Sequence, residues 1–494
     1  MAMMMNFILS IAIWTPISLG ILLLILQKNL SANIIYKLGN IFGFISFLIT
    51  IPLYIFFDTT YSGFQFQEIS PWISHFSIQY HLGLDGISLP LVMLTSFITW
   101  LVIFISSNSI SRSLGSYIAS FLILSGLMIG VFLALDAILY YVFWEAMLIP
   151  MFLLIGVWGG PNRVYATIKF FLYTVLGSLL MLVAFIYLFN QTGSFSIVDF
   201  YTKQLSLTAQ VFIFIAFFMA FAVKIPMWPV HTWLPDAHVE APTGGSVILA
   251  AIMLKLGAYS FIRFAMPIAP DGLLLLKPYL IAISLIAIVY IALVAIVQTD
   301  MKKLIAYSSI SHMGFVTLGL FMLNPLGFEG GYVQMISHGF ISAALFFSIG
   351  VLYDRMHTRE IKDYGGVINS MPLFGSFFVL FAMANSGLPG TSGFVGEFLV
   401  ILGAMQENFW IAFLAALTLI FGATYSLWLV KRIIFGVAKN KKIAGLIDLN
   451  AKEFFVMSAL AGLTLIIGIY PALITDITNQ SSIVMLELIQ QSKI

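Results

Sequence analysis

The stretch Phe221–Ser260, FAVKIPMWPVHTWLPDAHVEAPTGGSVILAAIMLKLGAYS, determines how the rest of the chain is interpreted. It holds two lysines, Lys224 and Lys255, each within an apolar run long enough to cross a bilayer. A cationic side chain at the centre of a membrane helix costs at least ~3 kcal/mol on insertion scales, so such residues are rarely without function. The stretch therefore predicts an internal site that contains titratable amines.

Two prolines follow Lys224 and predict that the helix ends beside it. Pro226 and Pro229 lack a backbone donor, and their rings clash with the preceding turn. An interrupted helix at membrane depth is tolerated only where it faces protein or water. A second interruption is expected at 385–398, NSGLPGTSGFVGEF, because glycines and a proline stand inside a long apolar run; Glu397 follows them.

The composition indicates an all-α polytopic membrane protein. Hydrophobic residues make up 61% of the 494 residues and charged residues only 9%, and the mean hydropathy is +1.05, beyond what a water-soluble core accommodates. The first apolar run lacks a basic n-region and a cleavage site, so we expect a retained helix. The absence of cysteine excludes disulfides, iron–sulfur clusters and c-type haem attachment. Fourteen runs have the length of a transmembrane helix: 7–26, 36–57, 87–106, 115–133, 137–157, 164–189, 208–229, 242–264, 278–298, 302–322, 330–352, 371–404, 409–435 and 453–473.

The placement of basic residues predicts the orientation. Loops after even-numbered runs hold only Lys203, Arg263 and Lys277. By the positive-inside rule the odd-numbered loops face the cytoplasm or matrix, so both termini are expected on the periplasmic or intermembrane side. Sixteen basic residues follow odd-numbered runs: Lys28, Lys37, Arg112, Arg163, Lys169, Lys302, Lys303, Arg355, Arg359, Lys362, Lys431, Arg432, Lys439, Lys441, Lys442 and Lys452.

Interrupted helices at corresponding positions of two halves are typical of transporters built from inverted repeats. We therefore predict a single membrane domain over 1–494, with one repeat at 115–264, the other at 278–435, and flanking helices in 1–114 and 436–494. The broken helices, the seventh and the twelfth, are each the fourth of five in their repeat. The loop 58–86 is expected to cap the bundle.

Six titratable residues are expected eight to sixteen residues from a helix end, near the middle of a ~30 Å hydrocarbon core: Glu145, Lys224, Lys255, His312, His338 and Glu397. Glu145 either stays neutral or reaches interfacial water, or it is a counter-ion for Lys224, since intramembrane charges usually pair. The two histidines lie amid serines, which favours a proton relay over isolated hydrogen bonds.

Other site chemistries are weakly supported. His312 and His338 lie on separate helices without a ligand-spaced pair, which disfavours a metal site. No Ser–His–Asp or Gly-x-Ser-x-Gly context and no phosphate-cradling loop after a strand is recognisable. Asp236, His238 and Glu240 in the loop after the seventh run either collect protons at the cytoplasmic surface or form a solvated connection.

Seven motifs over most of residues 80–435 carry a strong resemblance to a known family. They are YVFWE at 141–145, AFAVKIPMWPVHTWLPDAHVEAPTGGSVILA at 220–250, KLGAYSFIRF at 255–264, QTDMKKLIAYSSISHMG at 298–314, SHG at 337–339, LYDR at 352–355 and LPGTSGFVGEF at 388–398. The chain resembles the antiporter-like, Mrp-type subunits of the proton-translocating NADH:quinone oxidoreductase, respiratory complex I. A glutamate at position 397, where the L and N branches carry lysine, points to the M-type (chain 4) branch.

The resemblance implies fourteen helices with two inverted five-helix repeats, in one proton pump among several in a membrane arm. It implies that Glu145 holds Lys224 charged, that Lys255 passes the proton along a central line with the two histidines, and that Glu397 delivers it towards the far side.

The same resemblance implies a translocase subunit without its own cofactor, with flavin, iron–sulfur clusters and quinone in partner subunits. Expected partners are other membrane-arm subunits, including those of the L and N branches, and lipids, but no nucleic acid. The expected location is the bacterial inner membrane, or the mitochondrial inner membrane for an organellar protein. Two alternatives stay open: a subunit of a multicomponent Na⁺/H⁺ antiporter or membrane-bound hydrogenase, and a stand-alone secondary transporter.

Overall fold

The computed structural model describes residues 7–106, 110, 112–438 and 440–494, so Lys439 lies outside the described residues. In this part of the chain 12 helices are long and apolar enough to cross a membrane, which confirms the all-α polytopic prediction. The chain forms two compact units. Unit 1 consists of the described residues of Met1–Ile225 with Ile252–Pro278 and Asp476–Ile494, and unit 2 of Pro226–Ala251 and Tyr279–Thr475.

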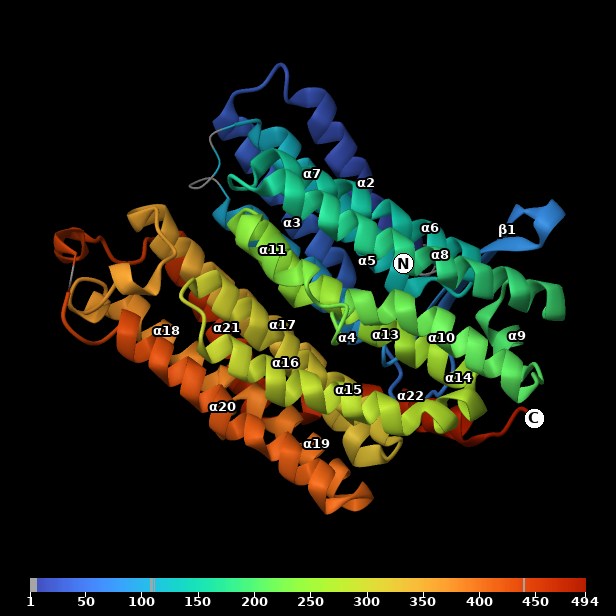
Figure 1. The fold of residues 1–494 in the computed structure, drawn as a ribbon. Coiled ribbons are helices and arrows are strands. Elements are labelled where there is room, and N and C mark those ends of the chain that lie inside the picture. Colours follow the sequence, from blue (N-terminus) through green and yellow to red (C-terminus); the bar gives the residue numbers. More distant parts are fainter. Residues whose placement is uncertain (1–6, 107–109, 111, 439) are drawn as a thin grey trace. The chain divides into compact units, whose positions relative to one another are not determined.

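Unit 1 contains the elements up to Lys224, coloured blue to green in Figure 1, together with short segments from later in the chain. Within it α2 packs on α5, α3 on α4, and α8 on α10. Its elements are α2 (Ile8–Leu26), α3 (Ala32–Ile55), β1 (Gln65–Ile73), η1 (Ser74–Phe76), β2 (Ile78–Leu84), α4 (Leu89–Ile105), α5 (Leu114–Leu133), α6 (Ala137–Ala146), α7 (Leu148–Trp158), α8 (Arg163–Thr192), α9 (Ile197–Thr202), α10 (Leu207–Lys224), α13 (Leu254–Ser260), η3 (Phe261–Ala265) and α14 (Met266–Ile268).

Unit 2 is built around α17, which packs against α16, α19 and α21. Three further elements, η2 (Leu249–Met253), α15 (Pro270–Ile296) and α22 (Ala472–Gln490), run from one unit into the other. The elements of unit 2 are α11 (Trp233–Glu240), α12 (Thr243–Ile248), α16 (Met301–Met322), α17 (Pro325–Met356), η4 (Ile361–Asp363), η5 (Val367–Asn369), α18 (Pro372–Asn385), α19 (Ser392–Glu407), α20 (Phe409–Ile433), η6 (Lys441–Gly445) and α21 (Ala451–Ile469).

Both predicted helix interruptions are present. The helix α10 ends at Lys224, and regular helix resumes only at Trp233. The second interruption separates α18 from α19, and its turn places Gly387 at φ +74° and Gly390 at φ +88°. Positive φ is easily reached only without a Cβ, so glycine is needed at both positions.

A third interruption was not predicted. The run 137–157 forms α6 and α7, which are separated at Met147. Pro150 explains the irregular turn, because it has no N–H for the carbonyl of Ala146 and its ring would clash with that carbonyl in a regular helix. Asp136 caps the start of α6 by accepting from the backbone N–H groups of Ile138 and Leu139. Because α6 ends at Ala146, Glu145 lies one residue before the end of this helix.

The run predicted at 242–264 is not a uniform α-helix. Two π-helical segments, η2 and η3, flank the short helix α13 that carries Lys255. Such π turns occur mostly as local insertions in α-helices, often at functional sites. Gly257 brings α13 close to the end of α10, since an added Cβ would stand 2.8 Å from the carbonyl oxygen of Phe221 and 3.0 Å from the nitrogen of Ile225.

The loop predicted at 58–86 is partly a β-hairpin. The strands β1 and β2 pair antiparallel, with Gln65 opposite Leu84 and Ile73 opposite Ile78. The alternation that signals a strand is short here and Pro71 interrupts it, so the pattern did not predict the pairing. Glu68 fixes the hairpin to α2, because its carboxylate accepts from the backbone nitrogens of Leu9 and Ser10.

The predicted count of fourteen membrane helices stays a prediction. Two of the fourteen runs fall outside the 12 candidate spans of the described residues: α4 is one residue too short, and the broken pair α18 and α19 forms two shorter helices. The helix α22 was missed, since the last predicted run ends at 473. The division into two units rests on contacts within the chain and does not test the predicted inverted repeats.

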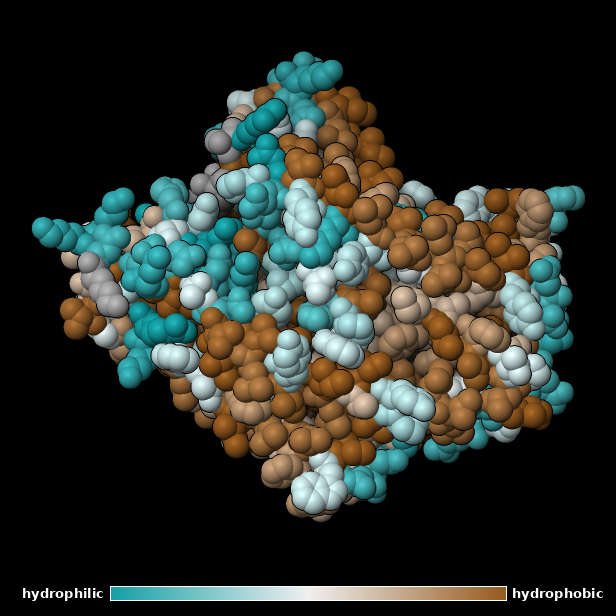
Figure 2. Space-filling model, in the orientation of Figure 1, coloured by the Kyte–Doolittle hydropathy of each residue, from teal (hydrophilic) through white to brown (hydrophobic). Residues whose placement is uncertain are grey.

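Large hydrophobic side chains remain exposed along many helices, as expected for surfaces that contact lipid. Figure 2 shows such side chains in brown over much of the visible face. On α8 they recur about once per turn: Val164, Ile168, Leu172, Leu176, Leu179, Val183 and Ile186 are all exposed. By contrast, the most apolar window of α17 is completely buried.

Substituting Gly257 tests the close approach of α13 to α10. Gly257→Val puts a branched side chain against backbone atoms of Phe221 and Ile225, which cannot move away cheaply. We expect a loss of about 1–3 kcal/mol in stability, as for other overpacked sites. Thermal unfolding of the purified protein measures it. Gly462→Ala is the control, because its Cβ would meet nothing within 4 Å. Equal stability of the two variants would contradict the close packing.

Candidate functional site

In unit 1, Lys224 lies in an aromatic enclosure next to Glu145. Its side chain is 1% exposed. The amine Nζ lies 5.1 Å from the ring centroid of Trp144 and 5.8 Å from that of Phe170, distances at which a cation is attracted to an aromatic face. Glu145 interacts electrostatically with Lys224.

The two groups do not form a direct hydrogen bond. Lys224 Nζ and Glu145 Oε1 are both buried and have no hydrogen-bond partner among the described residues. A buried polar atom without a partner is costly, so it usually marks a bound water or a group whose partner changes. The structure therefore places Glu145 and Lys224 in one cluster, and their role as an ion pair stays a prediction.

Lys255 belongs to the same unit and is completely buried in α13. The contact of Gly257 with Phe221 and Ile225 places the lysine-bearing segment of α13 against the end of α10, where Lys224 lies. Since η2 ends immediately before α13, Lys255 follows a π turn closely. Lys224 thus lies at the end of a helix, and Lys255 follows a π turn. In such backbone, successive side chains need not follow the regular α-helical spacing of 3.6 residues per turn.

In unit 2, His312 and Glu397 are in direct contact. The imidazole Nδ1 lies 2.9 Å from Glu397 Oε1, and both side chains are nearly inaccessible to solvent. His312 comes from the middle of α16, and Glu397 from α19, just beyond the break in the twelfth predicted run. A carboxylate and an imidazole at this distance can share or exchange a proton.

Two side chains that sequence reasoning missed complete this cluster. Tyr425 of α20 lies with its hydroxyl 3.1 Å from His312 Nε2. Gln334 of α17 has its Nε2 3.3 Å from Glu397 Oε1 and 3.4 Å from His312 Nδ1. Each is a polar residue in a largely apolar helix, which was the available signal, but only the packing of α16, α17, α19 and α20 identifies their partner.

His338 lies close to this cluster on α17. Its ring centroid is 5.9 Å from that of His312. One turn later, the Ser342 hydroxyl donates to the His338 carbonyl at 2.5 Å, and next to it Ser337 donates to Ser392 at 2.7 Å. The prediction that the two histidines lie at similar depth among hydroxyl groups is consistent with this arrangement.

Glycines allow the cluster to close around Glu397. A Cβ on Gly387 would stand 2.8 Å from Glu397 Oε2, and a Cβ on Gly396 would stand 2.6 Å from the Gln334 backbone. The motif 388–398 and its neighbours therefore do two things: they break the helix, and they let the carboxylate approach α17.

Of the six predicted residues, Glu145, Lys224 and Lys255 lie in unit 1, and His312, His338 and Glu397 lie in unit 2. The histidines and Glu397 lie close together in unit 2, and Glu145 lies near Lys224 in unit 1, whereas Lys255 lies on the neighbouring helix α13. The predicted continuous line through all six, and the role of each residue, stay predictions.

The segment 236–240 was predicted either to collect protons at the cytoplasmic surface or to form a solvated connection, and its burial contradicts the solvated connection. It forms the helix α11, in which His238 is completely buried and Glu240 is 7% exposed. The His238 ring stacks on Phe346 at 4.5 Å between centroids. Lys302, counted as a surface residue, is also buried, and its Nζ donates to the Ala241 carbonyl at 2.7 Å. Neighbouring helices of unit 2 cover this segment, which the hydrophilic sequence did not indicate.

Arg263 was also placed wrongly, in a loop. It is completely buried in η3 and forms an ion pair with Asp85, from Nη2 to Oδ1 at 2.7 Å. Nothing in the local sequence links two residues so far apart in the chain.

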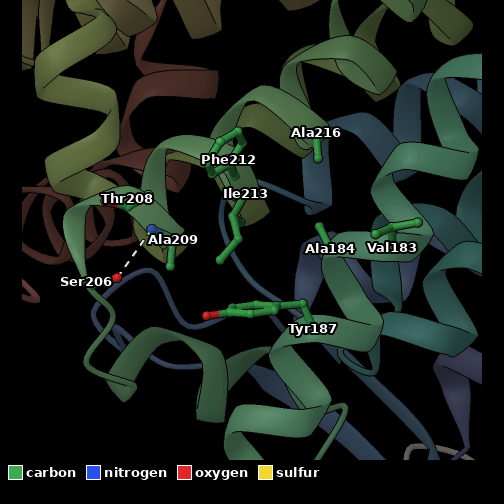
Figure 3. Close-up of a pocket in the computed structure, with 9 residues that line it drawn as sticks. All are labelled: Val183, Ala184, Tyr187, Ser206, Thr208, Ala209, Phe212, Ile213 and Ala216. Carbon is green, nitrogen blue, oxygen red and sulfur yellow. Dashed lines mark hydrogen bonds between the residues drawn. The ribbon is translucent and has the colours of Figure 1, made fainter.

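The groove shown in Figure 3 lies in unit 1 between α8 and α10 and has a volume of about 400 Å³. Apolar side chains such as Val183, Phe212 and Ile213 line it, with Tyr187 at one side and the α10 cap residue Ser206 at its end. None of the six predicted residues lines the groove. It therefore supplies no support for a solute site at the titratable cluster.

Tyr425→Phe tests the contact with His312. Removing the hydroxyl leaves the buried His312 Nε2 without its partner, which costs about 1–3 kcal/mol. A lower thermal unfolding temperature of the purified protein is the expected result. Tyr353→Phe is the control, since Tyr353 is 41% exposed. A Tyr425→Phe protein as stable as the control would argue against the hydrogen bond.

A family comparison and individual relatives of this chain indicate the same protein family. Residues 134–422 match the protein family described as NADH:quinone oxidoreductase/Mrp antiporter, transmembrane. NADH-quinone oxidoreductase subunit M of Rhodobacter capsulatus is 50% identical over 450 residues, covering 88% of this chain and 87% of the relative. NADH-ubiquinone oxidoreductase chain 4 of Chondrus crispus is 46% identical over 479 residues, covering 97% of each chain.

Solved structures of related complexes contain chains with the same fold. A chain of respiratory complex I from Thermus thermophilus superposes with a TM-score of 0.89 at 31% identity, covering 98% of this chain and 100% of that chain. The Mrp complex from Dietzia gives a TM-score of 0.82 at 22% identity, covering 97% of this chain and 55% of that chain, which shows a shared fold alone. The chain therefore belongs to the NADH:quinone oxidoreductase/Mrp antiporter family of transmembrane proteins.

Proposed function

We propose that this chain is the M-type (chain 4) subunit in the membrane arm of a proton-translocating NADH:quinone oxidoreductase, and that it moves protons across the membrane. The His312–Glu397 contact carries the proposal, because it places a proton acceptor and a proton donor 2.9 Å apart beside a broken helix. Relatives 44–50% identical that bear the names subunit M and chain 4 support it. Their names favour complex I over a multicomponent antiporter, to which the family description and the fold likeness also point.

In this proposal unit 1 loads the proton and unit 2 releases it. Lys224 holds a proton while Glu145 is nearby and ionised, and gives it up when that carboxylate withdraws or is neutralised. Lys255 accepts it next, and His312, His338 and Glu397 carry it towards the far side. Tyr425 and Gln334 hold the His312–Glu397 pair in place.

The free energy available from a change in the Glu145–Lys224 interaction is similar to the free energy needed to move one proton across the membrane. Removing one partner of a buried charge pair costs about 3–5 kcal/mol. Moving one elementary charge against ~150 mV costs about 3.5 kcal/mol. One change in the Glu145–Lys224 interaction is therefore sufficient, in free energy, to drive one proton across the membrane.

The redox reaction belongs to partner subunits in this proposal. Flavin, iron–sulfur clusters and quinone bind there, and this chain contributes a translocase step without a redox centre of its own. Its expected neighbours are the related L and N subunits and membrane lipids. The chain is a multi-pass protein of the bacterial or mitochondrial inner membrane, and the distribution of basic residues supports both termini lying on the periplasmic or intermembrane side.

Substitutions at Lys224 and Glu145 test the proposal in the assembled complex. Lys224→Ala and Glu145→Ala are expected to abolish or severely lower NADH-driven proton uptake into proteoliposomes, with assembly retained. Lys224→Arg is expected to fail in the same way, because arginine keeps the charge but does not release its proton. Lys37→Ala, an exposed lysine of the same unit, is the control. Normal pumping by the Lys224 variants would overturn the proposal.

A further inference from the structure

The buried Arg263–Asp85 pair has no place in the proposed relay, and its arginine lies in η3, directly after the helix α13 that carries Lys255. Arg263 follows Lys255 by eight residues, about 12 Å along the helix. Its Nη2 donates to both oxygens of Asp85 at 2.7 Å. Asp85 follows β2 directly, so the pair lies between Lys255 and the end of unit 1 that carries the β-hairpin.

Asp85 and two of the three guanidinium nitrogens of Arg263 are hydrogen-bonded within the protein. Asp85 Oδ1 also accepts from the Ser88 nitrogen at 2.9 Å and from the Ser88 hydroxyl at 2.8 Å. Arg263 Nε donates to the Tyr259 hydroxyl at 3.2 Å. The remaining nitrogen, Nη1, has no hydrogen-bond partner among the described residues, and the guanidinium lies 4.9 Å from the Phe64 ring.

The Ser88 hydroxyl donates to Asp85, whereas the other hydroxyl groups close to the pair donate to backbone carbonyls. Tyr259 donates to Phe132 at 2.8 Å, and Tyr201 donates to the carbonyl of Arg263 itself at 2.7 Å. Ser260, which contacts Tyr140 at 2.5 Å, donates to Leu256 at 2.5 Å. A proton that hops along hydrogen bonds needs an onward acceptor that can also donate, and a backbone carbonyl does not donate.

The guanidinium cannot serve as such a step. Arginine has five donors and no acceptor, and it does not lose its proton in proteins. An ionised carboxylate, in turn, only accepts. The pair therefore places two charged groups that do not pass a proton on next to the segment that follows Lys255.

We propose that the Asp85–Arg263 pair is a proton-insulating plug that prevents protons held at Lys255 from escaping along α13 and η3 towards the hairpin end of unit 1. The inference rests on the proposed proton translocation and adds a positioning role for two residues outside the relay. It explains why a full charge pair is buried where a hydrophobic pair would cost less. A purely structural role would instead attach the segment after β2 to η3.

Two double substitutions separate the plug from a structural anchor, because both remove the ion pair. Asp85→Asn with Arg263→Gln introduces two neutral amides, and the shorter glutamine leaves room for water, which hydrogen-bonds to the amides and carries the proton. Asp85→Leu with Arg263→Met fills the site with apolar groups. The complex is reconstituted into proteoliposomes, a pH gradient is imposed without NADH, and its decay is followed with a pH-sensitive dye.

The amide variant is expected to lose the gradient several-fold faster than the wild type, whereas the apolar variant keeps it. Adding Lys255→Met to the amide variant is expected to restore the slow decay, because the leak passes through Lys255. If both double variants decay at the wild-type rate, or both leak equally, the plug is contradicted. Should the amide pair prevent assembly, the single Arg263→Gln variant is subject to the same criterion.

A failure of the plug can be distinguished from a failure of the proposed function. Passive decay is measured without turnover, and Lys224→Ala, which blocks pumping in the proposed function, is expected to leave it unchanged. Normal pumping by Lys224→Ala would reject the relay, whereas a tight gradient in the amide variant would reject the plug.

Discussion

A titratable side chain at membrane depth is stable only where protein or water encloses it, and the arrangement of this chain follows from that constraint. Lys224, Lys255, His312 and Glu397 are all nearly completely buried, while the large apolar side chains of α8 remain exposed. The polar groups are thus separated from lipid by the helices that carry them. Broken helices are found at the same places, since freed backbone groups face the same requirement.

The two units meet this requirement with different chemistry. In unit 1 an amine lies over aromatic rings with a carboxylate nearby but without a direct hydrogen bond, which leaves room for its partner to change. In unit 2 an imidazole and a carboxylate are in contact and are bracketed by a tyrosine and a glutamine. The Lys224 cluster can change its partners, which suits a step that responds to a signal. The His312–Glu397 cluster is fixed by its contacts, which suits a step that only conducts protons. The Asp85–Arg263 pair adds a third type, an ion pair held by hydrogen bonds from Arg263 Nη2 to both carboxylate oxygens, which in the proposal passes no proton.

Sequence reasoning succeeded where the cause is local. Pro226 and the glycines near 387–393 break helices through their own backbone chemistry. The depth of the six titratable residues was inferred from run length and stays a prediction. Sequence reasoning failed where the cause is a distant neighbour. The sequence places Arg263 in a loop, and only the structure shows its ion pair with Asp85. Likewise, Tyr425 has the sequence context of an ordinary residue in an apolar helix, and its contact with His312 is seen only where α20 packs on α16. The break after α6 was available from Pro150 and was overlooked.

The central claim is that titration of side chains in the middle of this subunit carries protons, and Glu397→Gln tests it most directly. The amide keeps the size of the side chain and its contact with Gln334 but cannot ionise. The measurement is the ratio of protons translocated to NADH oxidised by the reconstituted complex. The account predicts a lower ratio in the variant with assembly retained, and an unchanged ratio would contradict it.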